Sequence, residues 1–381
     1  MMETLAEQNP PDTAPSALDV LQAAAAVGLP GGRRPIGAEP FVLSATALTM
    51  ATTHRVQGLL CAAIDAGVVV GDDDMLASAR AAHVAALRTC LVSEATALLA
   101  LEALARHDVE ARVLKGVAIA HLDHDDPAER VFGDVDVLVR RTDHHTALRA
   151  LVDAGFTRSK PPIRSWWEQR FAKAIVFRAP WGAELDVHFA IAGGDFGYRI
   201  DHDRLWATPS RAFDLGGHQA RGLDAEGRLL QACCHAVLGV RPASDPGLRV
   251  KRDIAQLVLV TGADWRATVE CASNDGVDLV VAEAVRTTWS ELSLDPEHPL
   301  LQWARDHVAT QQQRKALQSY QSAFDVGWAP EGRGSIKALG PLQRVLFIIG
   351  LAVPSRASLR WRGRTWRQHL RIGWPTLRSR A

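Results

Sequence analysis

Apolar positions recur at three- and four-residue spacing through both ends of the chain, and this period predicts helices. Near the N-terminus the pattern covers Leu18–Val27, Ala45–Ala66 and Ala77–His107. The third block is rich in Ala and Leu and has no Pro or Gly, so one long helix is expected. Beyond residue 223 the same period predicts helices at Asp224–Leu238, Gly247–Thr261, Asp264–Ser273 and Asp278–Leu292.

The middle of the chain has a different pattern, with short runs of β-branched residues and two-residue alternation typical of strands. Strands are expected at Glu110–Leu114 and Val131–Arg140, and two hairpins are expected further along. Short helices are expected at Val117–Leu122 and Thr142–Ala154. The hairpins pair Lys173–Arg178 with Glu184–Ile191 and Arg211–Leu215 with His218–Gly222.

This succession predicts an α/β (α+β) protein whose small mixed sheet lies between helical regions. The chain of 381 residues is long enough for two or three domains. The expected segments are a disordered tail (1–16), an N-terminal helical region (17–109), an α/β core (110–222), a helical domain (223–325) and a Gly-rich loop with an Arg-rich C-terminal segment (326–381).

Charge excludes a chain dedicated to coating nucleic acid, since 43 basic and 43 acidic residues balance. The basic residues are nevertheless concentrated at the C-terminus. Residues 356–381 contain eight Arg and no Asp or Glu. This segment could bind RNA or an acidic membrane, but a solvated amphipathic helix is favoured.

Cysteine use and hydropathy indicate a cytoplasmic protein without integral membrane contact. The five cysteines have neither the spacing of a zinc site nor an even number for disulfides. No secretory signal pattern is present, and the longest apolar run, Val345–Val353, is about half of what a membrane span needs.

Candidate chemistry is concentrated around Asp134 and Asp136 in the sequence Gly133-Asp134-Val135-Asp136. On a strand, residues two apart share a face, so these carboxylates would stand side by side. Paired carboxylates suit Mg²⁺, which leaves other positions to water and phosphate oxygens. A solvated strand face is the alternative. Asp186 lies on another expected strand, and if the two strands were adjacent it would complete the triad of a two-metal phosphoryl-transfer site.

The dipeptide Lys115-Gly116 precedes the first short helix of the core. Glycine allows close approach of the backbone, and a helix N-terminus binds anions. Lysine adds a positive charge for phosphates. Only six of the 43 basic residues are lysines, so a lysine at this position is notable.

These motifs resemble the uncharacterised nucleotidyltransferase family of the DNA polymerase β-like superfamily. The matching elements are Leu114-Lys115-Gly116, Asp126-Pro127 with Arg130, Gly133–Val139 and Glu184–His188. The likeness extends outside the core to residues 53–56, to His235, Arg249 and Asp253, to Asp264-Trp265, and to residues 351–359. One departure is that Lys115-Gly116 replaces the superfamily's usual Gly-Ser turn.

The resemblance implies a polymerase β-like core and Mg²⁺-dependent transfer of a nucleoside monophosphate from an NTP, with ATP the expected donor. Asp134, Asp136 and Asp186 would be catalytic metal ligands, and Lys115, Gly116 and Arg130 would hold the triphosphate. The acceptor stays open. Two alternatives remain: a non-catalytic nucleotide-binding or regulatory module, and a phosphotransferase that tailors a small molecule or peptide.

Three further residues are candidates for the cleft. His188 could touch substrate or metal, or be a hydrogen-bonded histidine within the sheet. His235 and Asp253 could line the cleft from the helical domain, although a buried structural pair is favoured. Nucleic acid as a partner, through the Arg-rich segment, is possible but not favoured.

Overall fold

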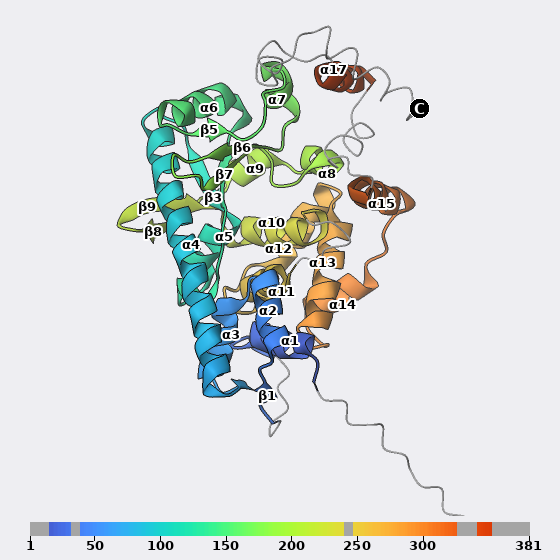
Figure 1. Cartoon of the computed structure of the whole chain (residues 1–381). Coiled ribbons are helices and arrows are strands. Elements are labelled where there is room, and N and C mark those ends of the chain that lie inside the picture. The colour runs from blue at the N-terminus through green and yellow to red at the C-terminus, as the bar shows by residue number, and fades with distance from the viewer. Residues whose placement is uncertain (1–14, 32–38, 240–246, 326–340, 353–381) are drawn as a thin grey trace, which may run out of the picture.

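The computed structural model describes residues 15–31, 39–239, 247–325 and 341–352 (Figure 1). The expected N-terminal tail up to residue 14, the Gly-rich loop at 326–340 and the Arg-rich segment beyond 352 lie outside the described residues.

The strands form a two-stranded and a seven-stranded sheet. The larger sheet has the order β5-β6-β7-β4-β3-β9-β8, in which β4–β7 and β3–β9 are parallel and the other neighbours antiparallel. The mixed sheet agrees with the expected fold class. The strands are β1 Phe41–Val42, β2 Val69–Val70, β3 Ala111–Leu114, β4 Val135–Val139, β5 Thr157–Arg158, β6 Ala174–Arg178, β7 Glu184–His188, β8 Arg211–Leu215 and β9 His218–Gly222.

Helices precede, interrupt and follow the strands of this sheet (Figure 1). They are α1 Ala17–Ala26, α2 Ala45–His54, α3 Gln57–Asp65, α4 Asp73–Ala105, α5 Lys115–Asp123, α6 His144–Asp153, α7 Ser165–Phe171, α8 Gly194–Arg199, α9 His202–Ala207, α10 Ala225–Leu238, α11 Leu248–Leu259, α12 Trp265–Asn274, α13 Asp278–Glu291, α14 Pro299–Asp306, α15 Gln311–Asp325 and α17 Pro341–Ala352.

Strand β4 separates two hydrophobic cores because its side chains alternate between two faces. Val135, Val137 and Val139 join a cluster with residues of α4 and the strands, which we call the sheet core. Leu138 points the other way, into a cluster built largely from α1–α3 and α10–α14, which we call the helical core. Asp136 lies on this second face, so the alternation brings a carboxylate to the boundary between the sheet and the helices.

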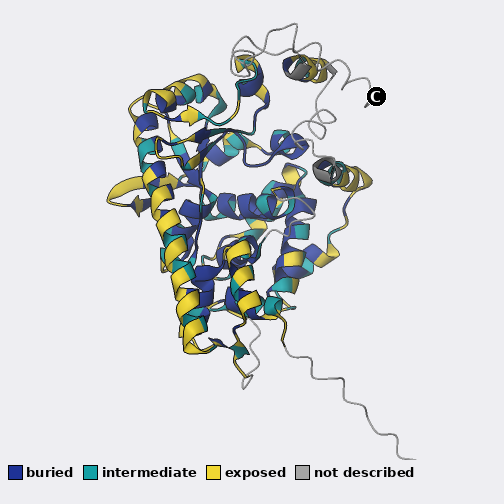
Figure 2. Ribbon diagram, viewed as in Figure 1, coloured by how far each residue is buried: buried dark blue, intermediate teal, exposed yellow. Residues whose placement is uncertain are grey.

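The elements differ in how far their residues are buried (Figure 2). Strands β3 and β4 and helix α10 are largely buried, whereas the hairpin β8–β9 and the outer side of α4 are exposed. Helix α4 contacts β3, β4 and β7. By length and composition alone, α4 is the one helix of the described residues that could cross a membrane.

Several expected elements differ from the structure in extent. Helix α4 begins at Asp73 rather than Ala77, and β7 ends at His188 rather than Ile191. Two further differences have a local structural cause. The expected helix Ala45–Ala66 is divided into α2 and α3, because Arg55 adopts the left-handed conformation (φ 53°). The expected strand from Val131 begins only at Val135. Before it, the Phe132 N–H donates to Cys90 Sγ and the Cys90 thiol donates to the Phe132 carbonyl, which takes this stretch out of the sheet.

Candidate active site

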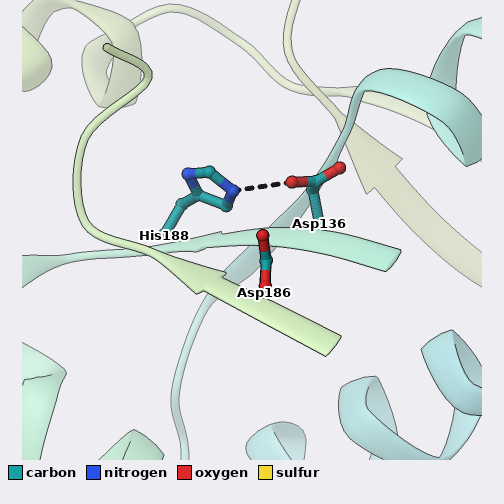
Figure 3. Close-up of side chains that lie close together, drawn as sticks. All are labelled: Asp136, Asp186 and His188. Carbon is teal, nitrogen blue, oxygen red and sulfur yellow. Dashed lines mark hydrogen bonds and ion pairs between the residues drawn. The ribbon is translucent and has the colours of Figure 1, made fainter. Parts of the chain in front are cut away.

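The parallel pairing of β4 with β7 brings the most conspicuous polar residues together. Asp136 is the register partner of Asp186, and His188 follows on the same face of β7. One ligand atom from each of these three residues lies within 4.8 Å of the others. Figure 3 shows the two carboxylates and the imidazole converging from the neighbouring strands. The condition that the strands be adjacent is therefore met.

Asp136 carries the negative charge of this cluster. Lys115 Nζ donates to Asp136 Oδ1 at 2.5 Å, and His188 Nε2 donates to the same oxygen at 2.6 Å. Burial would raise the pKa of Asp136, but the Lys115 charge and the His188 hydrogen bond outweigh it and hold the pKa well below its usual range. The carboxyl group is thus ionised at neutral pH.

Asp186 is in the opposite electrostatic situation. Burial and the neighbouring Asp136 charge raise the pKa of Asp186 to about 6. Its Oδ1 is buried and has no hydrogen-bond partner among the described residues. A buried polar atom without a partner is costly, and a divalent cation between Asp136 and Asp186 would satisfy it and offset the repulsion. The residues present therefore fit such a cation.

Both histidines near the carboxylates are neutral at physiological pH. Burial and the Lys115 charge lower the pKa of His188 to about 4. Burial, followed by the charges of Lys115 and Arg249, lowers the pKa of His235 well below its usual value. The positive charges beside Asp136 are therefore those of lysine and arginine.

A cleft opens in front of Asp136 between the sheet and the helices. Its walls come from α5, from the segment before β4, from β4 itself, and from α10 and α11. The lining residues are Lys115, Gly116, Ile119, Arg130, Asp134, Asp136, Gln231, Ala232, His235, Arg249, Val250 and Asp253. This set contains every candidate residue of the sequence analysis except Asp186 and His188.

Helix α5 begins at the cleft with no side-chain cap. Its first residue, Lys115, has a positive φ of 46°, which is uncommon outside glycine. A Cβ on Gly116 would lie 2.7 Å from Phe132 Cβ, so glycine permits α5 to pack closely on the segment before β4. The amide groups of this helix start and the Lys115 ammonium lie at one end of the cleft.

Arg130 is fully engaged with the protein. Its Nε and Nη2 donate to the two oxygens of Asp253 at 2.9 and 2.6 Å, and Nη1 donates to the Val131 carbonyl at 3.1 Å. The side chain thus ties the approach to β4 to helix α11. The partner that the structure gives Asp253 is Arg130, through a bidentate contact, and His235 and Asp253 both line the cleft.

Asp134 lies just before β4 at the exposed mouth of the cleft. Arg55 Nη1 stands 3.7 Å from Asp134 Oδ1. Asp134 is not part of the close group formed by Asp136, Asp186 and His188. Asp134 and Asp136 are therefore both at the cleft, but the carboxylate that lies close to Asp136 is Asp186 on the neighbouring strand.

Two polar residues of the cleft lining were not among the expected site residues. Gln231 on α10 accepts a hydrogen bond from the Lys115 amide at 3.3 Å. Arg249 on α11 makes no hydrogen bond or ion pair with any residue that the structure describes, and burial and the Arg130 charge lower its pKa to about 10. Position 249 belongs to the sequence likeness noted above, which was the only signal for it.

The mixed sheet and the carboxylate cluster are compatible with a nucleotidyltransferase, and the family comparison assigns the chain to this class. The uncharacterised nucleotidyltransferase family matches residues 44–317, more than two thirds of the chain. The chain belongs to this family. The comparison with curated proteins gave no match.

A solved structure, an antigenic nucleotidyltransferase-like protein from Paracoccidioides brasiliensis, is 17% identical with a TM-score of 0.31. The match covers 52% of this chain and 92% of that one. This distant likeness carries no argument about the site.

Proposed function

We propose that the protein transfers a nucleoside monophosphate from an NTP, with ATP the expected donor, to an acceptor hydroxyl, phosphate or amine, and that the transfer depends on Mg²⁺. The observation that carries the proposal is the register pairing of Asp136 with Asp186. This pairing places a buried carboxylate oxygen, without a partner among the described residues, beside a cleft lined by Lys115 and Arg249.

In this proposal Asp136 and Asp186 hold Mg²⁺, and Asp134 at the mouth of the cleft contributes a further carboxylate for a second ion. The bound metal would supply positive charge for the reacting phosphate. Asp136 is already ionised, whereas Asp186 must lose its proton near pH 6 to become a full ligand.

The phosphates would bind where the cleft offers positive charge and N–H donors. Lys115 and the amides at the start of α5 form one end, and the guanidinium of Arg249, which has no partner among the described residues, forms the other. Such fixed donors position the phosphates for in-line attack. Arg130 also lines the cleft, but its N–H groups hold Asp253 and the Val131 carbonyl, so it shapes the cleft rather than donating to the phosphates.

The first test is calorimetric binding of ATP, GTP, CTP and UTP with Mg²⁺. Asp136→Asn and Asp186→Asn should each weaken metal-dependent binding by at least about a hundredfold, because each removes a charged ligand. Asp153→Asn, an exposed carboxylate on α6, is the matched control and should bind as wild type.

A product assay separates the reaction types. Release of pyrophosphate supports nucleotidyl transfer, whereas release of ADP would indicate a phosphotransferase. Folded wild type that binds no NTP with Mg²⁺ would contradict the proposal and favour a non-catalytic module. We also propose a cytoplasmic location, where NTPs and Mg²⁺ are abundant.

A further inference from the structure

Among the described residues that line the cleft, Gln231 alone has a fully buried side-chain nitrogen without a hydrogen-bond partner. The residue is only 1% exposed, although it belongs to the cleft wall. A buried donor without an acceptor costs free energy, so this one needs an explanation. An acceptor supplied by a ligand in the cleft would remove the cost.

The neighbouring backbone group determines which end of the Gln231 amide is the oxygen. The Lys115 N–H can only donate, and it donates to Gln231 Oε1 at 3.3 Å. The atom without a partner is therefore Nε2, which can only donate. Because Oε1 and Nε2 belong to one amide group, this donor also lies at the start of α5.

Helix α10 packs against α5 and is joined to both of its ends (Figure 1). One turn before Gln231, Arg228 Nε and Nη2 donate to the two oxygens of Asp123, the last residue of α5, at 2.9 and 2.7 Å. Gln231 itself contacts Lys115, the first residue of that helix. The Gln231 amide is thus held in position before any ligand binds, as a preorganised donor must be.

We propose that Gln231 is a nucleotide-binding residue whose Nε2 donates a hydrogen bond to a phosphate oxygen of the nucleoside triphosphate. The inference rests on the proposed function and adds a contact from α10 to it. Phosphate oxygens are acceptors, as Nε2 requires. The Lys115 ammonium and the first amides of α5 lie beside the same donor and favour an anion there. The neutral acceptors of a base or a ribose would gain less from this positive charge.

The test is calorimetric binding of ATP and of inorganic triphosphate, each with Mg²⁺, at pH 8. Gln231→Met keeps the length of the side chain and removes the amide. Both ligands should bind at least about tenfold more weakly, because a hydrogen bond to a charged group is lost. Gln57→Met on α3 is the matched control and should bind as wild type. Gln57 is also buried, but it lies outside the cleft lining and its unpartnered atom is the acceptor Oε1.

A second variant separates the donor from the support that Gln231 gives to the Lys115 amide. In Gln231→Glu a carboxylate oxygen still accepts from the Lys115 N–H, but the ionised group has no donor and repels phosphate. Both ligands should bind at least as weakly as they bind to Gln231→Met. Binding of Mn²⁺ alone, followed by electron paramagnetic resonance, should be unchanged in Gln231→Met, because the amide is not one of the proposed metal ligands.

Three results would overturn the inference and leave the proposed function standing. The first is wild-type affinity for both ligands in both Gln231 variants. The second is a loss in Gln231→Met that Gln231→Glu does not show; Gln231 would then act only by supporting the Lys115 amide. The third is weaker binding of ATP with unchanged binding of inorganic triphosphate, which would place the base or the ribose beside Gln231. Wild type that binds Mn²⁺ but neither ATP nor triphosphate would instead contradict the proposed function, and this inference with it.

Discussion

Strand β4, with β7 paired beside it, lies on one side of the cleft, and helices α10 and α11 form the other side. We call these the sheet wall and the helical wall, and they differ in how their buried charges are paired. At the helical wall, two buried arginines each have both oxygens of an aspartate as partners. Arg130 is bonded by Asp253 through both carboxylate oxygens, and Arg228 is bonded in the same way by Asp123. At the sheet wall, Asp186 has a buried oxygen with no hydrogen-bond partner in the part of the chain that the structure describes.

The difference separates charges that hold the fold from charges that are available to a ligand. A bidentate buried pair is self-sufficient, and it stiffens the wall to which it belongs. A buried carboxylate with a raised pKa and an unpaired oxygen is a cost that a bound cation would remove. Arg130 and Asp253 therefore shape the cleft, while Asp186 is the group poised to respond to metal.

The largest expected effect comes from breaking the helical wall. Arg130→Met leaves Asp253 buried without its partner and should lower the free energy of unfolding by about 3–5 kcal/mol, measured by urea denaturation. The double variant Arg130→Met/Asp253→Leu should recover most of the loss. Arg178→Met, which breaks an exposed contact with Glu184 at 3.9 Å, should cost less than about 1 kcal/mol. A similar loss of stability in Arg130→Met and Arg178→Met would show that the buried pair contributes no more than an exposed one.

Removing a buried charge from the sheet wall should raise the free energy of unfolding at pH 7 rather than lower it. The folded pKa of Asp186 is about 6, against 3.8 as the unperturbed value, so the folded state holds its proton more tightly between these pH values. Stability from this group is full below about pH 4 and falls as pH rises to about 6, by up to about 3 kcal/mol. Asp186→Asn should remove this loss and raise stability at pH 7. If urea denaturation gave Asp186→Asn the same pH dependence of the free energy of unfolding as wild type, this prediction would be refuted.

The packing at the start of α5 gives a smaller effect. Gly116→Ala places a Cβ 2.7 Å from Phe132 Cβ and should cost about 1–3 kcal/mol in thermal or urea unfolding. Gly133→Ala is the control from the same cleft, because the nearest atom to its Cβ lies at 3.5 Å. Equal stability of the two variants would show that the close approach at Gly116 does not matter.

The smallest effect concerns metal affinity and pH. Because the proposed ligand Asp186 must be ionised, Mn²⁺ binding followed by electron paramagnetic resonance should tighten by about tenfold per pH unit up to about pH 6 and then level off. Asp153→Asn should show the same curve, and Asp186→Asn a weak and flat one. A wild-type curve without this rise would place the metal elsewhere.

The local sequence pattern was sufficient to predict much of the larger sheet. The alternation around Asp136 and Asp186 predicted strands with one polar face, and the hairpin Arg211–Leu215 with His218–Gly222 was confirmed at both ends. These features depend on neighbours in sequence, where a two-residue period or a Gly-Gly turn is visible directly. The mixed sheet between helices follows from the same signals.

Features that depend on distant contacts were not predictable. The late start of β4 results from Cys90, more than forty residues earlier in the chain, bonding the Phe132 backbone. The partner of Asp253 lies more than a hundred residues away, at Arg130. Tertiary contacts of this kind leave no periodic trace in the sequence, so neither spacing nor propensity could reveal them.

The parallel pairing of β4 with β7 also has a consequence for the order of folding. Residues 140–183, which include α6, β5, α7 and β6, must be in place before Asp186 can lie beside Asp136. Contacts across such a long loop form late, because closure costs entropy before pairing compensates for it. A divalent ion therefore cannot nucleate this fold from the unfolded chain, as zinc does in small metal-dependent domains. It can act only on a molecule whose architecture is already complete.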